Sequence, residues 1–556
     1  MRRSVEVPAG TSPGRTGVSS ARPLPRGALS AALVLISAAV WMFHAWWTLA
    51  RFDGARFTFD SAQYALAARE LASTGRLATP FSYVGALRDG LGPPFPMLAG
   101  HPLLPILQAP VFALVGAGPK AAILPVLLAH LLTVVLAALL VLECGGGTAL
   151  AACVGVTLAG TPAMLAFATD GLSEMPFTAA WTAAILLLAG FRRAPRSLAI
   201  GALLGLAHLA RPVVAPTLPV WLVAVSWAAA PGARVRHATW LLSGFVPFAA
   251  LMVLYKWSTT GHPFADVGGI MLLTGLSPEF GIHDVARVLH PPHALDWIRA
   301  HPGAFMEKLS HNVPEMARDG LHLGGWAAGL AFAWAVVRPV RDGLGPLRLL
   351  AGGSLALLAA LAALTLPRSH YLFPMLPTVV ALGAVSIAGI LRSVRMPSRA
   401  TPVVVALMLA WSSWRPLVRQ WQTPSASSPL ASEFTEREIA GLGATLAQRL
   451  PAGTLITSDM APWFSWYARL PSVNLPLRLQ DLAELRARNG VGAVVITNEW
   501  LVTLPGNEAW RDVFESRTSL PGWATLSVAR SGRLRAHVLV PDSAAVSPPP
   551  AASPGR

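Results

Sequence analysis

Residues 121–142 read AAILPVLLAHLLTVVLAALLVL, an apolar run without Asp, Glu, Lys or Arg. About 20 such residues are enough for one helix to cross the hydrocarbon core of a bilayer. The whole chain has the same character, because 54% of its 556 residues are hydrophobic and only 13% are charged. We therefore expect a polytopic α-helical membrane protein. This composition excludes a disordered chain, a collagen-like fibre and a water-soluble enzyme of ordinary make-up.

Ten further segments are predicted to cross the membrane, which makes about 11 transmembrane helices. The first follows a basic N-terminal arm, and its length favours a membrane anchor over a cleaved signal peptide. Segments 197–210 and 402–414 are short for a crossing. The ten segments are 28–50, 145–168, 175–190, 197–210, 212–229, 238–255, 321–337, 349–366, 372–391 and 402–414.

The positive charge is distributed as membrane topology requires. The formal net charge is +16, and arginines in short clusters between apolar runs carry nearly all of it. Basic clusters mark cytoplasmic turns, so they place the N-terminus inside and the C-terminus outside, and they argue against nucleic-acid binding. The two cysteines, Cys144 and Cys153, exclude a disulfide framework and are interpreted as small hydrophobic residues.

Three segments are too polar for the bilayer, and this topology places all of them outside. We predict a cytoplasmic basic arm at 1–27, a membrane domain at 28–419 with outer loops 51–120 and 256–320, an extracytoplasmic α/β domain at 420–541 and a disordered tail at 542–556. Within the α/β domain, helices are expected at 436–450 and 479–489 and strands at 454–457, 493–497 and 536–540. An amphipathic helix that starts at Asp60 is expected to lie on the bilayer.

Ionisable residues near the outer ends of the spans are the candidates for a functional site, because placing such a group close to a bilayer costs free energy. None of the predicted spans carries an acid within it, so the pattern favours a site at the outer interface over an ion path. Each residue has a simpler structural interpretation: Asp60 caps a helix, Asp170 and Glu174 favour a helix dipole, and the arginines reach toward headgroups. The candidates are Asp60, His101, Asp170, Glu174, Arg211, Arg368 and His370.

In combination, these positions resemble a known family. An outer-loop Asp heads a helix, followed by Gly100-His101-Pro102, a short acidic turn, the pattern G-L-A-x-L-x-R-P at 205–212 and R-x-x-Y-x-x-P at 368–374. This order resembles the GT-C class of integral membrane glycosyltransferases, in the branch of protein O-mannosyltransferases and lipid A aminoarabinose transferases. The resemblance covers about 28–391 and extends loosely to the outer α/β domain.

The resemblance implies a polyprenyl-phosphate-linked sugar donor and a catalytic acid at Asp60. It implies that Glu174, or Asp170 in its place, is a second acid and that His101 is a basic residue of the first outer loop. Residues expected to bind donor or acceptor on this basis are Tyr64, His101, Asp170, Glu174, Arg211, Arg368, His370 and Tyr371. The chain departs from the family pattern at two places: Pro102 is followed by Leu103 and Leu104, and Asp60 is followed by Ser61.

These features together predict a glycosyltransferase that moves a sugar to an acceptor hydroxyl with inversion, Asp60 acting as the base. The expected partners are the lipid-linked donor, membrane lipid and an acceptor protein, lipid or polysaccharide, without nucleic acid. No cofactor is required by the sequence, and a divalent metal is unsupported because Asp60 lacks an acidic neighbour. The arginine bias favours a bacterial cytoplasmic (inner) membrane. A transporter, a lipid-linked glycan ligase and a non-catalytic scaffold are the alternatives.

Overall fold

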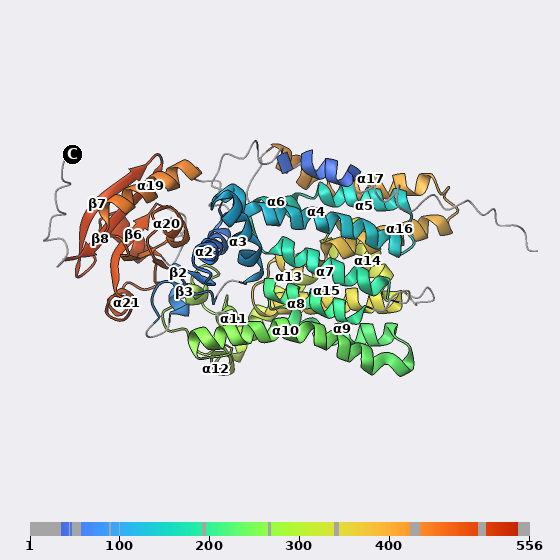
Figure 1. The fold of residues 1–556 in the computed structure, drawn as a ribbon, viewed down its shortest axis with the longest axis horizontal. Helices are drawn as coiled ribbons and strands as arrows, with labels where there is room; N and C mark the ends of the chain where they lie inside the picture. Colours follow the sequence, from blue (N-terminus) through green and yellow to red (C-terminus); the bar gives the residue numbers. More distant parts are fainter. Residues whose placement is uncertain are drawn as a thin grey trace, which may run out of the picture.

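A helical bundle and a smaller domain built on a β-sheet make up the molecule (Figure 1). The computed structural model describes residues 35–43, 45–46, 50, 57–87, 91–98, 101–191, 196–264, 268–338, 344–422, 434–498 and 507–542. The predicted arm 1–27 lies outside these residues, as do about half of segment 28–50 and nearly all of the predicted tail.

The other predicted spans all coincide with helices. Within the described ranges, four helical segments are long and apolar enough to cross a membrane, or up to six if each of two bent pairs counts as one span. A multi-span helical membrane protein is therefore confirmed, while the number of 11 crossings stays a prediction. The bundle helices are α4 (Pro119–Glu143), α5 (Thr148–Ala159), α6 (Pro162–Thr169), α7 (Glu174–Ala189), α8 (Ser197–Ala210), α9 (Val214–Ala228), α10 (Arg234–Thr260), α13 (Pro302–His322), α14 (Trp326–Val337), α15 (Gly345–Leu364), α16 (Leu376–Ser393) and α17 (Ala400–Gln422).

Two spans that were predicted as continuous helices are broken. Segment 145–168 divides into α5 and α6, which meet at 52°. Pro162 is the first residue of α6, where its missing N–H and fixed φ favour a helix start. Segment 321–337 begins in the last turn of α13 and continues, after a bend of 99°, in α14. Gly324 and Gly325 at this bend have φ of 77° and 91°, values that few other residues adopt.

Helices α8 and α10 pack closely enough for their backbones to touch. A Cβ atom on Gly201 would lie 2.0 Å from the carbonyl oxygen of Leu241, and one on Gly244 would lie 2.3 Å from that of Leu198. Small residues permit this approach in membrane proteins, where dispersion contacts rather than hydrophobic burial drive helix association. The contact fixes α8, whose last residue directly precedes Arg211.

The described part of the first predicted outer loop and residues 268–300 of the second lie together with the sheet domain at one end of the bundle (Figure 1). Residues 302–320 of the second predicted loop belong to the bundle helix α13. Helix α3, which packs against α2, was not predicted from the sequence. In the first loop the elements are α2 (Phe59–Thr74), β1 (Ala78–Thr79), β2 (Phe81–Ser82), η1 (Val84–Ala86), β3 (Phe95–Pro96) and α3 (Leu103–Val115). In the second they are α11 (Gly268–Met271), η3 (Pro278–Phe280), η4 (Val285–Arg287) and α12 (Ala294–Ala300), before α13.

The C-terminal part forms the predicted α/β fold around a six-stranded sheet of order β2-β5-β4-β6-β8-β7. The first four strands of this order are parallel, and β8 and β7 are antiparallel to their neighbours. Strand β2 comes from the first outer loop, which the sequence did not predict. The other elements are α19 (Glu436–Arg449), β4 (Leu455–Ser458), α20 (Ala461–Tyr467), β5 (Ser472–Asn474), α21 (Asp481–Asn489), β6 (Val491–Thr497), α23 (Glu508–Phe514), β7 (Trp523–Ser531) and β8 (Leu534–Pro541).

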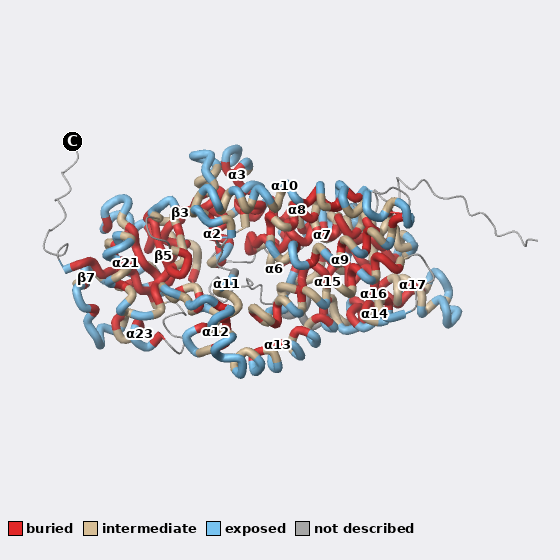
Figure 2. The backbone as a smooth tube through the Cα atoms, turned by 90° about the horizontal axis from the view of Figure 1, so that it is seen from below, coloured by how far each residue is buried: buried red, intermediate tan, exposed pale blue. Residues whose placement is uncertain are grey.

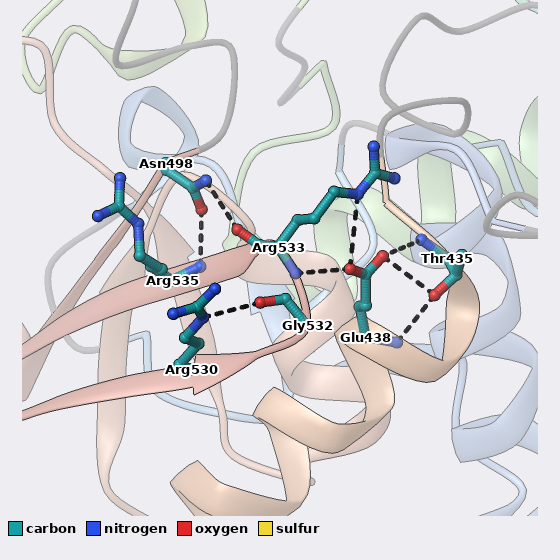
Figure 3. A network of polar contacts seen from close by, with 7 residues as sticks. All are labelled: Thr435, Glu438, Asn498, Arg530, Gly532, Arg533 and Arg535. Carbon is teal, nitrogen blue, oxygen red and sulfur yellow. Dashed lines mark hydrogen bonds and ion pairs between the residues drawn. The ribbon is translucent and has the colours of Figure 1, made fainter.

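The turn between β7 and β8 is tied to the start of α19 (Figure 3). Thr435 and Glu438 form a capping box, in which each side chain accepts the other residue's backbone N–H. Glu438 also accepts the backbone N–H of Arg533 at 2.7 Å, and Asn498 accepts that of Arg535 at 2.7 Å (Figure 3). One carboxylate thus stabilises both a helix end and a hairpin turn.

Candidate functional site

Helix α2, which carries Asp60, lies between the bundle and the sheet domain (Figure 2). Ala62, Ala65 and Leu66 belong to the hydrophobic core under the sheet domain, whereas Tyr64 and Ala67 belong to the core of the bundle. All five residues are buried. The prediction that this helix lies on the bilayer is wrong, because protein covers two of its faces.

The far end of α2 is fixed to the sheet domain by Arg69. Its guanidinium donates to the carbonyl oxygens of Ser465 and Trp466, each at 3.0 Å. It also lies over the Trp466 ring, 4.6 Å from the centroid. Because both carbonyls belong to the last turn of α20, their negative dipole end favours the cation.

Thr58, not Asp60, is the N-cap of α2. The side chains of Thr58 and Ser61 accept each other's backbone N–H groups at 3.2 Å and 2.8 Å. The interpretation of Asp60 as a helix cap is therefore wrong. Asp60 lies in the first turn of the helix, and its side chain is exposed.

The acidic turn between α6 and α7 packs against this first turn of α2. Tyr64 Oη lies 3.1 Å from Ser173 Oγ, which directly precedes Glu174. Gly171 has a φ of 71°, and a Cβ atom there would lie 3.6 Å from Ser61 Cβ and 3.3 Å from Ile123 Cγ2. Asp170 is buried at the end of α6. The turn therefore needs glycine at 171 to bring Glu174 close to α2.

We expect Gly171→Ala to lower the free energy of unfolding by about 1–2 kcal/mol, because an L-residue is disfavoured in the left-handed region. Turnover should fall as well, since the new methyl group presses on Ile123 and displaces the turn from α2. Thermal unfolding in lipid and turnover are the two measurements. Gly75→Ala is the control: Gly75 ends α2 with a φ of 72°, and its Cβ would meet nothing within 4 Å. Equal losses of turnover in both variants would contradict a role for the turn.

Glu174 and Arg211 form a buried ion pair between Oε1 and Nη2. The exposed fractions of their side chains are 6% and 16%. Among the described residues, Glu174 Oε2 and Arg211 Nε are buried without a hydrogen-bond partner. The guanidinium also lies over the Tyr371 ring, 5.7 Å from its centroid. Buried polar atoms normally have partners, so these two are available to a ligand.

The Asp60 carboxyl is reachable by water but surrounded by protein. Incomplete solvation raises its pKa to about 6; the Glu174 carboxylate raises this pKa further, and the Arg211 guanidinium lowers it. Gln63 Nε2 lies 3.5 Å from Asp60 Oδ1 and donates to Tyr83 Oη at 2.6 Å. Asp60 thus belongs to the same electrostatic cluster as Glu174 and Arg211.

The 368–374 motif forms the 3₁₀ helix η5 (Ser369–Met375) and places an exposed Arg368 at its start. The His370 and Tyr371 rings lie 4.3 Å apart, and His370 packs edge-on to Phe167 at 6.2 Å. His101 is half-buried, one residue before the N-cap of α3. Its membership of the site stays a prediction.

Three residues near the site were not predicted: Gln63, Tyr83 and His283. Gln63 follows Asp60 by one helical turn, so its position on α2 was an available signal. Tyr83 and His283 come from loops without a repeating pattern. Burial, together with the guanidinium groups of Arg368 and Arg287, lowers the pKa of His283 to about 4. Within the described ranges, no three or more His, Cys, Asp or Glu residues are grouped to hold a metal ion.

No protein-family model matches the sequence, and no curated protein matches it. Solved structures do. ArnT from Cupriavidus metallidurans in the apo state matches with a TM-score of 0.51 and 14% identity, over 94% of this chain and 100% of that chain. The same enzyme bound to undecaprenyl phosphate matches with a TM-score of 0.50 and 15% identity over the same shares.

The oligosaccharyltransferase of Archaeoglobus fulgidus, in complex with zinc and sulfate, is also similar. Its TM-score is 0.52 at 10% identity, over 84% of this chain and 67% of that chain. At these identities the likeness concerns the fold. The expected GT-C-like architecture, a helical membrane bundle followed by a C-terminal mixed sheet, is confirmed.

Proposed function

We propose that this protein is a glycosyltransferase that moves a sugar from a polyprenyl-phosphate-linked donor to an acceptor hydroxyl at the outer face of a bacterial cytoplasmic membrane. The observation that carries the proposal is the accessible Asp60 carboxyl beside the buried Glu174–Arg211 pair, between the membrane bundle and the sheet domain. A lipid-linked donor needs such a place, because its chain stays in the bilayer while its phosphate and sugar are polar. The fold supports the proposal, since a similar enzyme, ArnT, binds undecaprenyl phosphate.

In the proposed reaction the acceptor oxygen attacks the anomeric carbon on the face opposite the phosphate. A carbon–oxygen bond forms to the acceptor, the bond to the phosphate oxygen breaks, and its electron pair leaves with the polyprenyl phosphate. The acceptor's proton passes to Asp60. One direct displacement inverts the anomeric configuration, unlike the double displacement of two-carboxylate retaining glycosidases.

The leaving phosphate is the second requirement of this reaction. Arg211 offers its Nε–H group to a ligand, and Arg368 contributes a second, exposed guanidinium at the start of η5. Guanidinium groups bind phosphate with a rigid fork of donors and stay charged at every physiological pH. These groups stabilise the charge that develops on the phosphate, so the leaving group needs no acid.

We expect turnover to depend on pH through Asp60. The base works only when ionised, so kcat/KM should fall about tenfold for each pH unit below about 6 and level off above it. Removing the repulsive Glu174 charge with Glu174→Gln lowers the pKa of Asp60 and shifts the inflection to lower pH. Steady-state rates between pH 4.5 and 8 check this. A kcat/KM that does not change over this pH range would contradict the role of Asp60 as the base.

The direct test is sugar release from a labelled panel of polyprenyl-phosphate sugars by the purified protein in lipid, with candidate acceptors present. The panel includes a lipid-linked oligosaccharide, because a glycan ligase would turn over that donor alone. Transport of intact donor across sealed vesicles without sugar release would favour the transporter. Release that depends on Asp60 supports the transferase and identifies the donor class.

A further inference from the structure

Arg287, from η4 of the second outer loop, is a buried cation whose partners lie mostly in the sheet domain. Its side chain is 2% exposed. The guanidinium donates to the carbonyl oxygens of Leu475 at 2.8 Å and Pro476 at 3.3 Å, and to Asn507 Oδ1 at 2.7 Å. The same loop supplies the charge partner, Asp284, at 2.9 Å. A buried guanidinium is tolerated only when it is paired and hydrogen-bonded, as this one is.

Arg287 occupies the carboxyl end of the parallel strands. Leu475 directly follows β5, and the backbone oxygen of Arg287 accepts the N–H of Leu477 at 3.0 Å. Helices α20 and α21 follow adjacent strands β4 and β5 but belong to different core clusters. In the order β5-β4-β6, β4 connects to β5 and β5 connects back across β4 to β6, so the switch point, at which open α/β sheets bind ligands, lies between β4 and β6. The chain's own loop docks beside that position, on the segments that follow β5 and precede α23.

The docked loop also reaches the candidate site. Leu289 packs against the core cluster of the sheet domain that contains Val84. A Cβ atom on Gly85 would lie 3.1 Å from the carbonyl oxygen of Val288, so η1 and the end of η4 are in contact. Tyr83, which directly precedes η1, receives the hydrogen bond from Gln63. A continuous set of contacts thus joins Arg287 to the helix that carries Asp60.

We infer that Arg287 is a positioning residue: it docks residues 268–300 onto the carboxyl edge of the sheet and thereby holds this loop against the segment that carries Tyr83. The carboxyl edge of the sheet is then occupied by the chain's own loop and does not bind an acceptor. The effect on catalysis rests on the proposed function, whereas the docking itself does not.

Hydrogen exchange of the full chain in lipid, measured beside donor turnover, tests the inference. In Arg287→Met, exchange of 268–300 should rise about tenfold or more, because a hydrogen-bonded charge is lost, while β4 and β6 stay protected. Turnover should fall by a similar factor, with the KM for the donor changed less than about twofold, since the groups to which Arg287 docks the loop belong to the sheet domain and not to the proposed phosphate-binding residues. Asn507→Ala removes one acceptor from the domain side and should loosen the same segment to a smaller extent.

Arg478→Ala is the matched control, because Arg478 pairs with Glu279 across the same interface at 2.7 Å but both side chains are exposed. We expect exchange and turnover within about twofold of wild type there. Unchanged protection of 268–300 in Arg287→Met, or a released loop with full turnover, overturns the inference. If β4 and β6 also lose protection in Arg287→Met, that variant has disturbed the whole sheet domain. Exchange of 268–300 in Asn507→Ala then decides whether the loop is docked. Wild-type protein that releases no sugar from any donor contradicts the proposed function, while the exchange data still decide the docking.

Discussion

Asp60→Asn is expected to lower the rate of sugar transfer by about 10²–10⁴-fold, the contribution typical of a general base. The amide has nearly the same shape as the carboxylic acid but cannot accept the acceptor's proton. Thr58 and Ser61 cap α2 without Asp60, so the helix should keep its fold. Single-turnover rates with a labelled donor measure the chemical step, and equilibrium binding of the donor should change little.

The control for this variant is Glu70→Gln, the same acid-to-amide change on the same helix. Glu70 lies at the opposite end of α2 and is half-buried. Its variant should keep wild-type turnover. Full activity of Asp60→Asn at pH 7 would contradict the assignment of Asp60 as the base. Loss of activity together with a lower unfolding temperature would point instead to a structural role.

The membrane helices could be predicted from the sequence because the length and composition of an apolar run identify them without any knowledge of packing. Segment 197–210 coincides with α8, and 121–142 lies within α4. The candidate site residues were chosen for a related reason: ionisable groups are rare near a bilayer, so Asp60, Glu174 and Arg211 differ clearly from the apolar residues around them. The approach of Glu174 to Arg211 could not be read from the sequence, because it depends on how α7 and α8 pack.

What the sequence could not reveal are contacts between segments that are distant along the chain. Strand β2 has only two residues, too few for any period, and its partner β5 follows almost 400 residues later. Arg287 looks like any loop arginine until the sheet is folded around it. The same limit explains α2: its alanines read as one weakly apolar face, whereas the fold buries residues on two faces in two different cores.

The Glu174–Arg211 pair connects stability with function. Removing one member of a buried ion pair leaves an uncompensated charge, which typically costs about 3–5 kcal/mol. Yet Glu174 Oε2 and Arg211 Nε have no hydrogen-bond partner among the residues that the structure describes. A pair built only for stability would be expected to satisfy those atoms. The two roles separate in a double-mutant cycle, because stability depends on the balance of the charges and phosphate binding depends on the arginine itself.

In that cycle we expect Arg211→Met to lower the free energy of unfolding by about 3 kcal/mol, the low end of the range, because the arginine is still 16% exposed. Glu174→Gln should cost less, since the freed guanidinium is near the surface and can be solvated. Adding Glu174→Gln to Arg211→Met should recover most of the lost stability, because neither charge is then left unpaired. Turnover should not recover, since the leaving phosphate has lost its guanidinium. Denaturant unfolding in mixed micelles and donor turnover measure the two quantities on the same samples. Recovery of both in the double variant would make the pair purely structural and would transfer the phosphate-binding role to Arg368.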